Sequence, residues 1–92
     1  MELREAFGQA VRQVRKERGG QQEAVGPSQS YISDVERGLK SPSLAKIEDI
    51  ATALGVDVLT LVARAVLLQH PDLCVQDLLA KLQNDLSTVA EA

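Results

Sequence analysis

The chain has 92 residues, 45% of them hydrophobic and 25% charged, which is the composition of one globular domain. One cysteine and one histidine exclude an intrachain disulfide framework and a zinc cluster, so we expect no metal, no cofactor and a cytoplasmic location. No segment approaches the roughly 20 apolar residues of a membrane-spanning helix, and the two aromatic residues are too few for a base-stacking platform.

The net charge of −3 is unevenly divided along the chain. Residues 1–46 contain eight cations and six anions, whereas residues 47–92 contain two cations and seven anions. The first half is therefore slightly basic and the second half clearly acidic. Such an asymmetry indicates two faces that meet different partners.

Apolar residues recur at helical spacing throughout the sequence, without the period-two alternation that is typical of strands. The first helix is predicted from about residue 3 to the glycines at positions 19 and 20, with an apolar face made of Leu3, Phe7, Val11 and Val14. Residues 21–25 leave room for little more than one helical turn, because Pro27 disfavours helical geometry at Gly26.

Two capped helices are predicted next. Ser28 is a good N-cap for a helix over residues 29–37, and Gly38 is a good stop after it. Ser43 is predicted to cap the following helix, which ends at Gly55. The inward-facing residues of this helix are predicted to be Leu44, Ile47, Ile50, Ala51 and Leu54.

The last two helices are separated by a break at residues 70–72. Asp57 is the expected N-cap of a helix that runs to about Gln69, with Leu59, Leu61, Val62, Val66 and Leu67 as its apolar positions. Pro71 is favourable at the first position of a final helix. We therefore expect one domain over residues 1–69 and a helical extension over residues 70–92.

Residues 21–38 carry the most informative motif, which is a short helix, a tight turn and a capped helix with small polar residues at its start. This is the layout of a helix-turn-helix. The second helix of such a motif enters the major groove of DNA, about 12 Å wide, with its leading residues against the base edges. Gln29 and Ser30 suit that place, since an amide can donate and accept hydrogen bonds in one plane, as adenine requires.

Around this motif the chain contains YIS at 31–33, VERG at 35–38, PSL at 42–44 and ALGV at 53–56, preceded by VRQVRKERG at 11–19. Together these runs resemble the Cro/C1-type (XRE) family. The resemblance implies an all-α, five-helix Cro/C1-type (lambda-repressor-like) helix-turn-helix domain, followed here by a C-terminal amphipathic helix. It also implies a bacterial transcriptional regulator, most often a repressor, that binds double-stranded DNA sequence-specifically and is not an enzyme.

The resemblance also assigns expected roles to individual residues. Gln29, Ser30 and Asp34 fall on positions that face base edges, and Gln22, Tyr31, Arg37 and Lys40 fall on positions that face phosphates. Arg15 and Glu36 fall on a pair that links two helices, which we interpret as a structural ion pair. The residues alone leave other interpretations open, because Tyr31 can pack against the core and the polar members can be solvated surface.

The segment before the turn departs from the family pattern. Family members usually have about four more residues here, roughly one helical turn, and an aliphatic residue in place of Pro27. The distance from Gln22 to the recognition helix is therefore expected to be about 5 Å shorter, the rise of one turn.

The C-terminal stripe of Val75, Leu78, Leu79, Leu82 and Leu86 has two interpretations. It can pack on its own domain, or it can form a homodimer interface that lets two recognition helices bind a pseudo-palindromic operator, with half-sites about 34 Å apart. The alternative function is an antitoxin-like or adaptor protein whose last helix binds another protein. No catalytic site is expected, because the sequence shows no nucleophile set, carboxylate pair or phosphate-binding loop.

Overall fold

The computed structural model describes residues 1–20 and 28–91. These residues form five α-helices and no strand: α1 (Leu3–Glu17), α2 (Gln29–Glu36), α3 (Leu44–Leu54), α4 (Val58–Gln69) and α5 (Val75–Glu91). The predicted all-α fold class is confirmed. The short helix expected over residues 21–25, which includes Gln22, lies outside the described residues.

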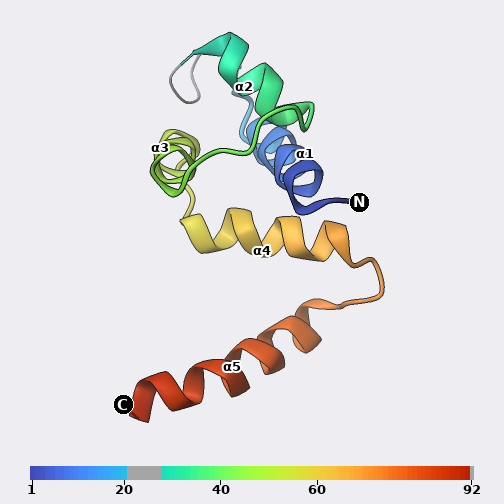
Figure 1. Ribbon diagram of the computed structural model, residues 1–92, viewed down its shortest axis with the longest axis vertical. Coiled ribbons are helices and arrows are strands. Elements are labelled where there is room, and N and C mark those ends of the chain that lie inside the picture. The colour runs from blue at the N-terminus through green and yellow to red at the C-terminus, as the bar shows by residue number, and fades with distance from the viewer. Residues whose placement is uncertain (21–27, 92) are drawn as a thin grey trace.

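The core is built around α1, which contacts α2, α3 and α4 (Figure 1). Its buried side chains are almost all aliphatic: Ala6, Phe7, Ala10, Val11 and Val14 from α1, Ile32 and Val35 from α2, Ile50, Ala51 and Leu54 from α3, and Leu61 and Ala65 from α4. Gly8 lies where α1 passes the end of α2, so closely that a Cβ there would collide with the carbonyl oxygen of Val35. The absence of a side chain at position 8 therefore sets how near these two helices lie.

The ends of α2 and α3 follow the predicted capping residues. The Ser28 hydroxyl accepts a hydrogen bond from the Tyr31 N–H at 3.1 Å, and the Ser43 hydroxyl accepts one from the Lys46 N–H at 3.2 Å. Gly38 and Gly55 follow the two helices with φ of 75° and 73°, a left-handed conformation that residues with a side chain rarely adopt. Local sequence thus determines where these helices start and stop.

Several residues predicted to face inward are exposed instead. Leu3, Leu44 and Leu59, in the first turns of α1, α3 and α4, are 48%, 82% and 64% exposed. The prediction for Pro71 was also wrong, because α5 begins only at Val75. Cys74 precedes that helix, and its carbonyl oxygen accepts the Leu78 N–H at 3.1 Å.

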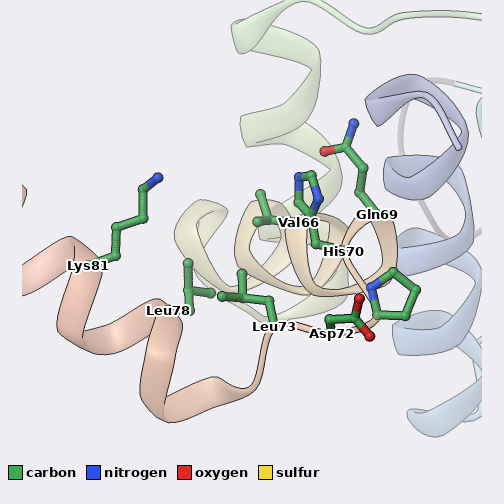
Figure 2. A pocket seen from close by; sticks show the side chains of 8 residues that line it. Val66, Gln69, His70, Asp72, Leu73, Leu78 and Lys81 are labelled. Atoms are coloured by element: carbon green, nitrogen blue, oxygen red, sulfur yellow. The ribbon is translucent and has the colours of Figure 1, made fainter.

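A turn at residues 70–73 connects α4 to α5, and α5 lies apart from α1, α2 and α3 (Figure 1). Leu78, only 9% exposed, is its buried residue. Figure 2 shows Leu73 and Leu78 side by side between α4 and α5, at the edge of an open hollow of about 530 Å³. Leu78 is thus the residue through which α5 packs most closely on the rest of the described domain.

Within the described residues, no single helix is long and apolar enough to cross a membrane. Helices α3 and α4 reach the required length and composition only when taken together, and they are bent by 102° at the break between them.

Candidate nucleic-acid interface

The first turn of α2 is polar and exposed to solvent, while the inner side of the helix is packed in the core. Ile32 and Val35 are fully buried on its inner side and contribute to the core against α1. Gln29 and Ser30 are exposed on its first turn, and the cap at Ser28 holds that turn in helical geometry. Two of the three predicted base-facing residues thus lie together on one exposed helix end.

The far end of α2 is tied to α1 by a nearly buried ion pair. Arg15 Nε lies 2.6 Å from Glu36 Oε2, and Arg15 Nη2 lies 2.9 Å from Glu36 Oε1, a two-point contact between guanidinium and carboxylate. The side chains of Arg15 and Glu36 are only 11% and 4% exposed. Arg15 also donates to the carbonyl oxygen of Gly20 at 3.2 Å, so one side chain connects α1, α2 and the segment after α1.

Cations gather around Tyr31, which is half-buried and packs against the core. The ammonium nitrogens of Lys40 and Lys46 lie 5.3 and 5.8 Å from the centre of its ring, within the range of a cation–π contact. Lys46 was not among the predicted site residues. Its position on α3 gave no reason to place it beside α2, and only the packing of the two helices brings it there.

Asp34 lies within the same group of charges. Its Oδ1 accepts a hydrogen bond from Arg37 Nη2 at 2.9 Å, and its Oδ2 lies 3.7 Å from Lys40 Nζ. The carboxylate therefore has a cation at each oxygen. The structure brings Asp34, Arg37 and Lys40 together as a cluster, which the sequence did not predict.

The remaining predicted residues lie elsewhere. Gln22 is outside the described residues. The C-terminal stripe lies on α5, at the opposite end of the long axis from α2 (Figure 1). Sequence reasoning also missed a contact between Arg64 on α4 and Glu17 on α1, at 2.6 and 3.2 Å. The local sequence of neither helix indicates that these two residues are in contact.

The stripe on α5 has one buried residue and a set of more exposed residues, which we call the outer face. Leu78 points toward α4, as the side view in Figure 2 shows. Val75, Leu79, Leu86 and the unpredicted Val89 are between 55% and 67% exposed. An apolar groove of about 460 Å³ runs between α4 and α5, lined by residues that include Leu59, Leu67, Leu79 and Leu82.

The model of the helix-turn-helix family matches residues 11–61, which run from the middle of α1 to the first turn of α4. The immunity repressor protein of Bacillus phage phi105 is 38% identical over 67 residues, 68% of this chain and 46% of that protein. The HTH-type transcriptional regulator y4dJ of Sinorhizobium fredii is 38% identical over 66 residues, 67% of this chain and 86% of that protein. This chain therefore spans less than half the length of the phage repressor.

Among solved structures, the clp gene regulator ClgR from Corynebacterium glutamicum is similar, with a TM-score of 0.67 and 32% sequence identity. The likeness covers 99% of this chain and 93% of that one. Because almost the whole chain is covered, the likeness extends beyond the four helices of the core and includes α5.

Proposed function

Because the chain belongs to the Cro/C1-type helix-turn-helix family of DNA-binding transcriptional regulators, we propose that it is a cytoplasmic repressor that binds a pseudo-palindromic operator as a homodimer. The observation that carries this proposal is the exposed polar turn of α2, anchored through Ile32 and Val35. A recognition helix needs a rigid base and a polar end small enough for the major groove.

Specificity is assigned to the first turn of α2. Gln29 can make a two-point contact with adenine, and Ser30 can add one hydrogen bond to a neighbouring base. Both side chains are exposed and lie next to each other on the helix. Asp34 is the third predicted base-facing residue, one turn further along α2.

Affinity is assigned to the cations beside this turn. Arg37 and Lys40 extend into solvent after α2, and Lys46 lies next to Tyr31 at the start of α3. Contacts to phosphates position a protein on the duplex and contribute most of its sequence-independent affinity. The acidic residues of the second half include those on α5, at the far end from α2, where they do not face the phosphates.

The homodimer is assigned to the outer face of α5. Val75, Leu79, Leu82, Leu86 and Val89 follow one another at alternating spacings of four and three residues, the pattern of a helix that pairs with another helix along a seam. Leu78, which was predicted to belong to the interface, instead faces α4, and we assign it to holding α5 in place. Two recognition helices contact more base pairs than one, which a useful specificity requires.

The exposed face of α5 also supports a second candidate function. The same apolar residues can bind a different protein, as in an antitoxin-like or adaptor role. The oligomeric state of the purified chain distinguishes the two, because a seam that pairs with itself gives a dimer and a seam that awaits another protein gives a monomer.

The deciding experiment selects bound duplexes from a random DNA pool. Enriched inverted repeats with half-sites about 34 Å apart, one helical turn, support the proposal, and a pool without enrichment refutes DNA recognition. Gln29→Ala is expected to lose roughly 1–3 kcal/mol of discrimination at one base pair of each half-site. Gln9→Ala removes an exposed glutamine from α1 and serves as the matched control, with an unchanged preference.

A further inference from the structure

In the cluster of Asp34, Arg37 and Lys40, a carboxylate lies between the two cations that the proposed function assigns to DNA phosphates. Each oxygen of Asp34 is close to a different cation, Arg37 at 2.9 Å and Lys40 at 3.7 Å. Carboxylate and phosphate oxygens are both acceptors that match a guanidinium and an ammonium group. The side chains of both cations are more than half exposed, so a DNA backbone that approaches α2 can reach them.

These contacts are weak enough to exchange. Arg37 and Lys40 are 63% and 55% exposed, and ion pairs in that setting are strongly screened by water and salt. A phosphate that approaches the two cations can therefore replace the carboxylate. It must do so against the negative charge of Asp34, which stays on α2 and repels it.

We propose that Asp34 is an internal counter-ion that occupies the phosphate-binding site beside the recognition helix in the free protein and lowers its affinity for duplex DNA of every sequence. This inference rests on the proposed function. It gives Asp34 a role that acts through Arg37 and Lys40 and differs from reading a base.

The consequence is a protein that all duplex DNA, operator and non-operator alike, holds less tightly. The cost of displacing Asp34 is the same for every sequence, because the phosphate backbone is the same. Base preference is therefore set by the first turn of α2, and Asp34 sets the general level of binding. A carboxylate that instead accepted a hydrogen bond from cytosine would change the preference at one base pair.

The test compares the wild-type chain with Asp34→Asn, which keeps the shape of the side chain and removes its charge. We expect binding to a random duplex and to the selected operator to tighten by the same factor, roughly two- to fivefold per protomer. The dependence of affinity on salt is expected to steepen by up to about 0.9 in log–log slope per protomer, the value of one more phosphate contact. Asp77→Asn makes the same change of net charge on α5 and is expected to change neither quantity.

Each outcome has a distinct meaning. Unchanged binding of Asp34→Asn to random duplex, with the wild type still selecting an operator, overturns the inference and leaves the proposed function standing. A changed preference at one base pair, without tighter random binding, also overturns it and makes Asp34 a base-reading residue. A wild-type chain that binds no duplex at low salt overturns both. Melting of each variant by circular dichroism shows whether the fold is retained.

Discussion

Glu36→Ala is expected to destabilise the fold strongly. The carboxylate of Glu36 and the guanidinium of Arg15 are nearly buried, with side-chain exposures of 4% and 11%. Removing the acid leaves a guanidinium charge in a site that water hardly reaches. Breaking a buried pair in this way typically costs about 3–5 kcal/mol. A domain of this size has a total stability of about 5–15 kcal/mol, so the loss is a large fraction of it.

The assays are urea unfolding, which gives the free energy of unfolding, and thermal melting, both followed by circular dichroism at constant pH and salt. For a loss of about 3 kcal/mol, the melting temperature is expected to fall by roughly 12–24 °C. Glu17→Ala is the matched control, because Glu17 also pairs with an arginine, Arg64, but is 56% exposed. The free energy of unfolding of Glu17→Ala is expected to be less than about 1 kcal/mol lower than that of the wild type.

A double variant, Arg15→Met with Glu36→Leu, separates the buried charge from the lost contact. Replacing both partners by apolar residues removes the charge, so the double variant is expected to be more stable than Glu36→Ala alone. If Glu36→Ala costs no more than Glu17→Ala, the buried pair does not hold α1 to α2 in the way described. If the double variant is as unstable as the single one, the cost arises from packing and not from the buried guanidinium charge.

Three further predictions follow from the same structure. Lys40→Ala is expected to weaken binding to all duplexes about equally and to reduce the salt slope by about 1 per protomer, and a loss confined to the operator would contradict a phosphate contact. Leu79→Asp with Leu86→Asp is expected to give a monomer in sedimentation experiments, whereas Leu44→Asp, an equally polar change at an exposed leucine of α3, leaves a dimer; a dimer in both variants would exclude the α5 seam. Gly8→Ala is expected to lower the free energy of unfolding by about 1–3 kcal/mol or more in chemical denaturation, because the new methyl group meets backbone at the end of α2; an unchanged stability would show that the two helices can separate without cost.

The helix boundaries near the motif were predictable because single residues determine them. Ser28 and Ser43 supply hydroxyl caps, and Gly38 and Gly55 adopt a conformation that favours glycine. These effects act over three or four residues and can be inferred from the sequence. The start of α5 was not predictable in this way, because Pro71 is compatible with a helix start but does not require one.

Burial was less predictable than helix position. Helical spacing correctly placed Ile50 and Leu54 in the core but also included Leu44, which is exposed. Helical spacing identifies which side of a helix is apolar. A residue on that side is buried only where another helix packs against that part of the helix. The candidate site shows the same limit: the exposed positions of Gln29 and Ser30 follow from α2 alone, while the approach of Lys46 to Tyr31 depends on how α2 and α3 pack.

In the proposed dimer, the slender attachment of α5, centred on Leu78, separates the choice of pairing partner from the choice of operator. Substitutions along the exposed leucines of α5 would then change which chains assemble, at the far end of the molecule from α2 (Figure 1). On this proposal, duplicated genes for such a chain would diverge into regulators that no longer mix with each other while still competing for one promoter.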